Sequence, residues 1–215
     1  SSAIICACLR ALMEFYGVED QIPKHIQPNL VLSVENDELG IPAGLQDRVI
    51  QVYEGVVFMD FNRGHMETLG HGIYEELDPA LLPKLYVAYT KRLSEGTEVF
   101  HNDIRSRWNR GERDVVSAMY HWANLAERVK ELLLSGRGRE IGPLLNENFD
   151  VRRRLYKISP GNIEMVEIAR AVGASAKFTG SGGAIVGTYD DDAMFDKLVE
   201  AYQGRDIEVI RPEII

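Results

Sequence analysis

The sequence lacks the features that define several classes of protein. No apolar run approaches the roughly 18 residues that a membrane-spanning helix needs. The apolar stretch at residues 3–9 has no basic residue before it, unlike a signal peptide. Only two cysteines occur, Cys6 and Cys8. At positions i and i+2 of a helix they point to different faces, so we expect no disulfide between them and a cytoplasmic location.

Positive charge is also in short supply. Twenty-four Lys and Arg residues stand against 33 Asp and Glu residues, which gives a formal net charge of −9. Sequence-independent nucleic-acid binding needs a broad basic face, so we expect no nucleic-acid partner. The five histidines are not spaced as metal ligands. A local basic pocket for a small anion is still compatible with this composition.

What the sequence does have is an interleaved pattern of helices and strands. We expect helices at 3–16, 29–39, 45–53, 98–109, 112–135, 140–156, 162–172 and 191–202, and strands at 56–61, 73–77, 85–89, 175–179, 184–187 and 207–210. Residues 62–72 are expected to be a loop. This order predicts an α+β fold of two lobes, with domains at 1–90 and 91–215.

The first two residues are serines that open an apolar helix. A helix N-terminus offers unpaired N–H groups and a positive dipole end to a phosphate, and a serine hydroxyl can ligate Mg²⁺. Ser1 and Ser2 are therefore candidate ATP-binding residues, although simple N-capping is the alternative. Because the chain opens without methionine and enters a helix at once, we expect a further N-terminal segment before Ser1.

Two carboxylates flank a predicted helix–turn–helix junction. Glu35 falls before Gly40, and Asp47 opens the next helix. Such a hairpin can bring both into one cleft, where one carboxylate holds Mg²⁺ and the other orients or deprotonates a hydroxyl. The alternative is a pair of solvated acids.

A glycine-rich turn lies between two late strands. Gly180, Gly182 and Gly183 surround Ser181. Successive N–H groups in such a turn can form a concave anion site. No helix is expected to follow, so the turn fits neither a P-loop nor a dinucleotide fingerprint, and a plain hairpin turn is the alternative.

These pieces occur together in a specific order. The sequence resembles the GHMP small-molecule kinases, and among them the plant glucuronokinase type, at Ser1-Ser2-Ala3, Ala43-Gly44-Leu45-Gln46-Asp47-Arg48-Val49, Asn148–Arg154 and Lys177–Gly183. The resemblance implies a ribosomal-protein-S5-like first lobe, here partial, and a ferredoxin-like second lobe with added helices. It implies ATP and Mg²⁺ as cofactors, with the metal on Ser2 and Glu35 and with Asp47 beside the acceptor hydroxyl. It also implies an ATP-binding role for Ser1, Ser2 and Gly180, Ser181, Gly182 and Gly183.

The resemblance further implies a phosphotransferase with an alcohol acceptor, a sugar 1-kinase that phosphorylates D-glucuronate. The alternatives are another GHMP kinase, of the heptose, galactose or mevalonate type, and a non-catalytic sugar-binding protein on the same fold. A sugar acid needs a cation for its carboxylate. Arg48, which adjoins Asp47, and Arg152 are the candidates, and a salt bridge to a structural acid is the alternative for Arg48.

Overall fold

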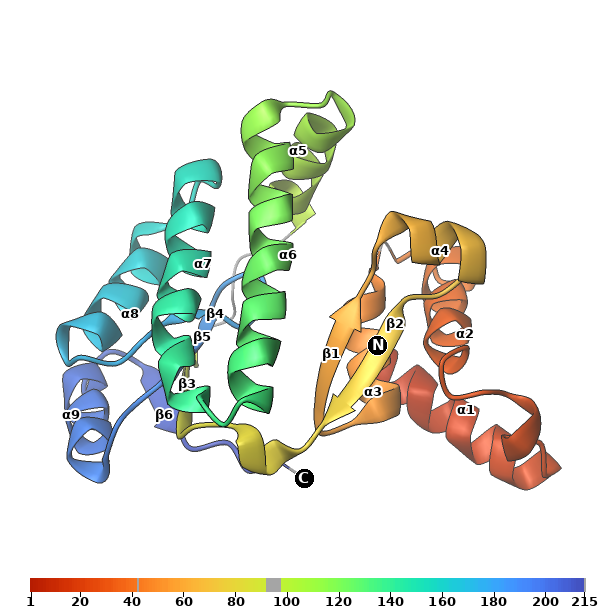
Figure 1. Cartoon of the computed structure of the whole chain (residues 1–215), viewed down its shortest axis with the longest axis horizontal. Helices are drawn as coiled ribbons and strands as arrows, with labels where there is room; N and C mark the ends of the chain where they lie inside the picture. The colour runs from red at the N-terminus through yellow and green to blue at the C-terminus, as the bar shows by residue number, and fades with distance from the viewer. Residues whose placement is uncertain (42, 92–97, 215) are drawn as a thin grey trace. The chain divides into compact units, whose positions relative to one another are not determined.

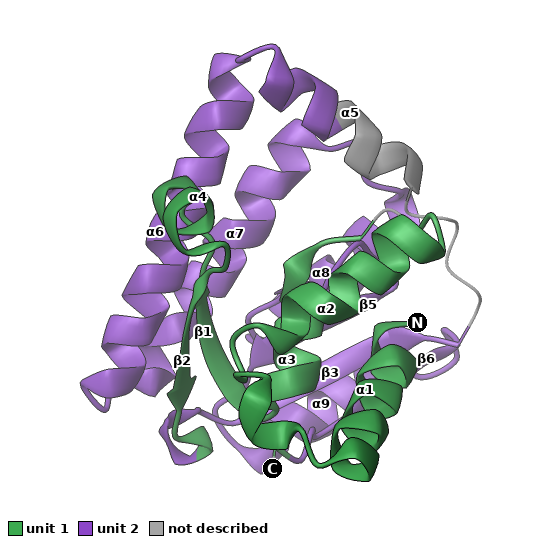
Figure 2. Cartoon of the chain, turned by 90° about the vertical axis from the view of Figure 1, so that its right-hand side faces the viewer, with its two compact units in different colours: residues 1–79, 214–215 green, residues 80–213 purple. Residues whose placement is uncertain are grey.

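The structure is a computed structural model, and it describes residues 1–41, 43–91 and 98–214. It divides into two compact units, which Figure 2 colours separately. The first contains Ser1–Pro79 together with Ile214, and the second contains Ala80–Glu213. The domain boundary expected near residue 90 stays a prediction, and each unit is described by itself.

The described part of the first unit combines four α-helices with a two-stranded antiparallel sheet (Figure 1). Its elements are α1 (Ser2–Tyr16), α2 (Gln27–Ser33), α3 (Leu45–Tyr53), β1 (Val56–Asp60), α4 (Arg63–Leu69) and β2 (Ile73–Leu77), with short helical turns at Glu19–Gln21 and Val34–Glu38. Cys6 of α1, Val31 of α2 and Val52 of α3 form its buried apolar cluster. Helices α1, α2 and α3 therefore share one small core.

The prediction of a loop at residues 62–72 is wrong, because helix α4 occupies most of that stretch. The Asn62 side chain accepts a hydrogen bond from the Gly64 amide at 2.8 Å and so caps the helix N-terminus. Gly70, at φ 77°, ends the helix in the left-handed conformation. Both capping signals are visible in the sequence, but the helix is only seven residues long.

The second unit is a four-stranded sheet with helices. The strands β3 (Leu85–Thr90), β4 (Lys177–Phe178), β5 (Ala184–Thr188) and β6 (Ile207–Ile210) follow the order β4-β5-β3-β6, and all neighbours are antiparallel. The helices are α5 (Glu98–Asn109), α6 (Arg113–Leu134), α7 (Gly142–Leu155), α8 (Pro160–Ala171) and α9 (Asp192–Tyr202), with short turns at Pro79–Leu81 and Gly138–Ile141. The predicted α+β class is confirmed.

The core of the second unit lies between this sheet and helices α7, α8 and α9. Tyr86 and Tyr202 are fully buried there, and their hydroxyls donate to the carbonyls of Ser175 at 2.8 Å and Met165 at 2.5 Å. Burial raises the pKa of both phenols, so they stay neutral donors. These bonds tie β3 to the segment before β4, and α9 to α8.

The helices in the described part of the chain are not of the kind that spans a membrane. None of them combines the length and the apolar character that crossing a bilayer requires.

Candidate functional site

The predicted site residues fall in both units, and the first group surrounds Glu35. This carboxylate lies in the helical turn Val34–Glu38 and is completely buried. Arg48 of α3, itself 7% exposed, donates from Nε and Nη2 to Glu35 Oε2. The turn at Gly40, with φ 64°, brings the two elements together. The cleft expected between the helix containing Glu35 and α3 is therefore occupied by a buried ion pair.

Arg48 also joins Glu35 to Asp47. Its Nη1 donates to the Gly44 carbonyl at 3.0 Å and lies 3.4 Å from Asp47 Oδ2. The Asp47 side chain is 72% exposed at the first turn of α3, where the helix dipole favours a carboxylate. One arginine thus holds a buried carboxylate on one side and contacts a solvent-accessible one on the other.

The serines are placed differently from each other. The Ser1 hydroxyl donates to Glu35 Oε1, while Ser2 is the first residue of α1. It is therefore Ser1, and not the predicted metal ligand Ser2, whose hydroxyl the structure records on Glu35. The role of Ser2 stays a prediction.

The balance of forces on Glu35 favours the charged form. Burial is the largest influence and raises the pKa of this carboxyl, but the hydrogen bond from Ser1 and the hydrogen bond and charge of Arg48 outweigh it. The net pKa lies below the ordinary value of 4.5. Glu35 is therefore an anion at neutral pH, with each of its oxygens already bonded to a neighbour.

The donor set for a metal can be judged from these contacts. Within the described residues, no three His, Cys, Asp or Glu side chains gather as metal ligands. What the site offers is a serine hydroxyl in contact with a carboxylate oxygen, the type of ligand that Mg²⁺ prefers. Magnesium commonly binds one or two carboxylates and fills its remaining positions with water and substrate phosphates. A two-oxygen set from Ser1 and Glu35 fits that pattern.

The second group of predicted residues surrounds the glycine loop, residues 180–183, in the other unit. Lys177 pairs with Val186 and Phe178 with Ile185, so the loop connects two antiparallel strands, as a hairpin. Gly182 has φ 147° and Gly183 has φ 75°. A Cβ on Gly182 would meet the Asn162 amide nitrogen at 3.0 Å, so this close approach and the backbone angle both require glycine.

Two side chains from neighbouring helices hold this loop. Arg152 of α7 donates from Nη1 to the Gly180 carbonyl at 2.7 Å. Asn162, near the start of α8, accepts from the Gly183 amide at 2.9 Å and donates to Ser159 Oγ at 3.0 Å. The shape of the loop is thus fixed by groups from both helices.

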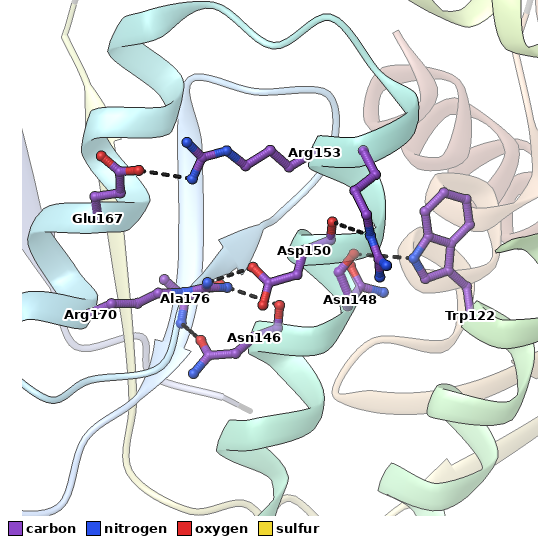
Figure 3. A network of polar contacts seen from close by, with 9 residues as sticks. Trp122, Asn146, Asn148, Asp150, Arg153, Glu167, Arg170 and Ala176 are labelled. Carbon is purple, nitrogen blue, oxygen red and sulfur yellow. Dashed lines mark hydrogen bonds and ion pairs between the residues drawn. The ribbon is translucent and has the colours of Figure 1, made fainter.

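The three consecutive arginines of α7 have separate partners. Figure 3 shows Arg153 directed at Glu167 of α8, at 2.8 Å, within the network that joins α7 to its neighbours. Arg154 donates to the Asp150 carbonyl at 3.3 Å. The Asp150 carboxylate accepts from Arg170 at 2.6 Å (Figure 3). Arg152 is the member of the run that contacts the glycine loop.

Sequence reasoning missed two residues of this second group. Asn162 was expected only as the start of a helix, and Lys177 was part of the quoted motif without a role. Lys177 Nζ donates to the Phe178 carbonyl at 2.7 Å, and both burial and the charge of Arg152 lower its pKa. The signal that was available was its position directly before the glycine loop.

The chain is similar to known proteins both in sequence and in fold. Residues 129–205 match the model of the C-terminal domain of GHMP kinases. Two solved structures share the fold along nearly all of this chain. Leishmania major mevalonate kinase in complex with R-mevalonate has a TM-score of 0.70 at 19% identity, covering 100% of this chain and 66% of that one. Streptococcus pneumoniae phosphomevalonate kinase, in complex with phosphomevalonate and AMPPNP, has a TM-score of 0.73 at 17% identity, covering 96% and 65%. The chain therefore has the fold of these kinases, and its residues 129–205 are similar to the C-terminal domain of GHMP kinases.

Among curated proteins the chain is 49% identical over 189 residues to glucuronokinase 1 of Arabidopsis thaliana. The alignment covers 86% of this chain and 52% of that protein. The chain thus spans about half the length of the curated relatives that it matches. The predicted likeness to plant glucuronokinases is confirmed.

Proposed function

We propose that this chain is part of an ATP- and Mg²⁺-dependent sugar 1-kinase that phosphorylates D-glucuronate. The observation that carries the proposal is the 49% identity to a glucuronokinase, which extends over 86% of the chain. The contacts among Ser1, Glu35, Arg48 and Asp47 support it, because phosphoryl transfer needs oxygen ligands for a metal and a positioned acceptor hydroxyl.

In this proposal Asp47 acts on the acceptor. Its carboxylate is accessible to an incoming hydroxyl, and Arg48 contacts one of its oxygens. The carboxylate accepts the hydrogen bond of the sugar hydroxyl, orients it toward the phosphoryl group and receives its proton. Arg48 contributes to the orientation of Asp47 in this proposal through its contact with Oδ2 at 3.4 Å.

The Mg²⁺ would be held by Glu35 and by a serine hydroxyl at the start of α1. When bound it supplies charge stabilisation for the transferred phosphoryl group. Arg48 keeps Glu35 ionised, so no proton has to be displaced from this carboxylate, whose oxygens are bonded to Ser1 and Arg48 in the structure. Ser1, Ser2 and the loop of residues 180–183 are proposed to contact the phosphates of ATP.

A cytoplasmic location is part of the same proposal. The structure keeps both cysteines as free thiols, with Cys6 buried and Cys8 exposed, which is the state expected in a reducing compartment. The small-molecule partner is a sugar acid, and no macromolecular ligand is proposed.

The identity of the product tests this proposal. The full-length protein that contains this chain is incubated with ATP, Mg²⁺ and D-glucuronate. The product is examined by phosphorus NMR. We expect a phosphate ester at C1 of the sugar and a matching yield of ADP. A phosphate at another carbon, or ATP consumption only with a heptose, galactose or mevalonate, would replace the assignment within the kinase class. Sugar binding without ADP formation would indicate a non-catalytic protein.

A further inference from the structure

Two histidines of the first unit form a pair that the proposed reaction does not use. The rings of His25, just before α2, and His71, between α4 and β2, have centres 4.4 Å apart and planes tilted by 44°. Both residues are partly exposed, so an ion in water can reach them. Lys24, which adjoins His25, is paired with Glu76 at 2.7 Å, so its repulsion of a second cation is offset. The spacing of the histidines along the sequence did not suggest metal binding, because the fold joins these two from separate segments.

The hydrogen bond of His71 determines which of its nitrogens can bind a metal. His71 Nδ1 lies 2.7 Å from the Gly72 carbonyl oxygen, which can only accept, so Nδ1 carries the proton. In the neutral ring Nε2 then keeps its lone pair. Metal-binding histidines are usually held in this way by a backbone carbonyl or a carboxylate. Within the described part of the chain, His25 forms no hydrogen bond or ion pair, so its nitrogens are available.

The spacing of the two rings fits one shared ion. A zinc ion binds an imidazole nitrogen at about 2.0–2.1 Å, which places it roughly 3.2 Å from the ring centre. Two rings on one ion therefore have centres roughly 4.5 Å apart when their bonds to it form a right angle, and roughly 5 Å apart in a tetrahedral site. The observed separation of 4.4 Å is close to these values. Both segments thus need only a small movement to bind the ion.

A buried oxygen on the same two segments lacks a partner. Asn29 Nδ2 donates to the carbonyl of Gly70, the residue before His71, at 2.7 Å. The Oδ1 atom of the same amide is buried and accepts no hydrogen bond within the described residues. An unpaired buried acceptor costs free energy. A water molecule bound to a metal at this junction is a donor of the kind that the amide oxygen lacks.

We propose that His25 and His71 together bind Zn²⁺ or a similar transition-metal dication that prefers imidazole nitrogen. This ion differs from the Mg²⁺ of the proposed reaction, because Mg²⁺ prefers oxygen ligands. No third His, Cys, Asp or Glu among the described residues joins the pair, so the site is open and water fills its remaining positions. The ion connects the segment before α2 to the turn before β2. Because the buried apolar cluster of this unit is small, such a cross-link stabilises it.

Zinc binding to the full-length protein that contains this chain tests the proposal. Zn²⁺ alone is titrated into the metal-free protein, and the binding is followed by calorimetry and by NMR of the histidine rings. We expect saturable binding that shifts the ring resonances of His25 and His71 and leaves those of His65 and His121 in place. Mg²⁺ at the same concentrations should shift neither ring of the pair. Unshifted His25 and His71 resonances at saturating Zn²⁺ would overturn the proposal.

Matched variants assign the binding to this pair. His25→Asn and His71→Asn should each weaken Zn²⁺ binding at least tenfold, since loss of even an outer-shell partner commonly costs about 10- to 100-fold in metal affinity. His65→Asn, which changes a histidine paired with Asp60 in the same unit, should bind as the wild type does. Unchanged affinity in both pair variants, or an equal loss in His65→Asn, would contradict the assignment.

The stability of the protein gives a second measurement. Zn²⁺ should raise the unfolding temperature of the wild type, EDTA should reverse the rise, and His71→Asn should show a smaller rise. An equal rise in His71→Asn would mean that the ion stabilises the protein from another place. No ATP turnover is measured in these experiments, so they are read independently of the proposed kinase activity.

Discussion

At the scale of single residues, the buried charge of Glu35 depends on Arg48. Arg48→Met leaves the carboxylate completely buried with only the Ser1 hydroxyl as a partner. Breaking a buried ion pair from one side costs about 3–5 kcal/mol, because an uncompensated charge remains. We expect the free energy of unfolding, measured by urea denaturation, to fall by about that amount.

Two controls separate this effect from a general loss of charge. Arg63→Met removes the arginine of an exposed pair with Glu67, and the cost should be below about 1 kcal/mol. The double variant Glu35→Gln with Arg48→Met removes both buried charges and should recover part of the stability. An Arg48→Met protein as stable as Arg63→Met would show that the ion pair does not support the fold.

The same carboxyl gives the first unit a pH dependence with a definite sign. The pKa of Glu35 in the folded protein lies below 4.5, so its stabilising contribution is complete above that pH. The contribution is lost as the pH falls through the folded pKa. Between about pH 6 and pH 3, the wild type should lose more unfolding free energy than the Glu35→Gln/Arg48→Met double variant. Parallel curves for the two proteins would contradict the assigned shift.

Asp47 is exposed and should matter for turnover rather than for stability. Asp47→Asn removes the proposed acceptor of the proton but keeps the shape of the side chain. We expect turnover to fall by roughly 10² or more, with little change in the urea midpoint. Asp37→Asn, an exposed acid in the turn that contains Glu35, is the control and should retain activity. Near-normal turnover of Asp47→Asn would remove this residue from the mechanism.

At the scale of elements, the register between β5 and the segment before β4 depends on Gly187. A Cβ at this position would lie 1.7 Å from the Ser175 carbonyl oxygen, which also accepts the Tyr86 hydroxyl. Gly187→Ala should therefore cost at least about 3 kcal/mol, at or above the usual range for overpacking. Gly161→Ala, in α8 with open space around the added carbon, should be neutral or stabilising by up to about 1 kcal/mol. Equal midpoints in urea for the two variants would contradict this account.

The elements that could be predicted are those whose local signals agree with their packing. Helix α3 was expected at 45–53 and is found at Leu45–Tyr53, because Gly44 precedes it and an apolar face runs along it. Helix α4 was missed, since a seven-residue helix that contains Gly64 and ends at Gly70 looks like a loop when only periodicity is considered. The capping role of Asn62 was the better signal.

The site was partly predictable for a similar reason. A turn between two helices implied that Glu35 and Asp47 lie close together, and the structure joins them through Arg48. The sequence could not show that Arg48 faces inward, because that depends on long-range burial of the ion pair. The same holds for Ser1 reaching Glu35 across 34 residues, and for Lys177, which forms no ion pair with an acid among the described residues.

At the scale of the whole chain, its net charge of −9 would oppose binding of the proposed acidic sugar, so selectivity for that sugar would require a local cationic site. A site that pairs a buried cation with the substrate leaves that cation unpaired when a neutral sugar enters. Rejection of the neutral sugar is then strong, and it should be visible in the kinetics of the active protein. Arg152 and Lys177 are two cations of the second unit that form no ion pair with a described acid, whereas Arg48 is committed to Glu35.

The proposed phosphorylation of D-glucuronate is tested most directly by comparing kcat/KM for D-glucuronate with kcat/KM for D-glucose. The two sugars differ at C6, where one carries a carboxylate and the other a hydroxyl group. We predict a preference for glucuronate on the order of 10⁴, as expected for a site built around a buried charged partner. Equal values for the two sugars, or a preference for glucose, would contradict the assignment to glucuronate phosphorylation.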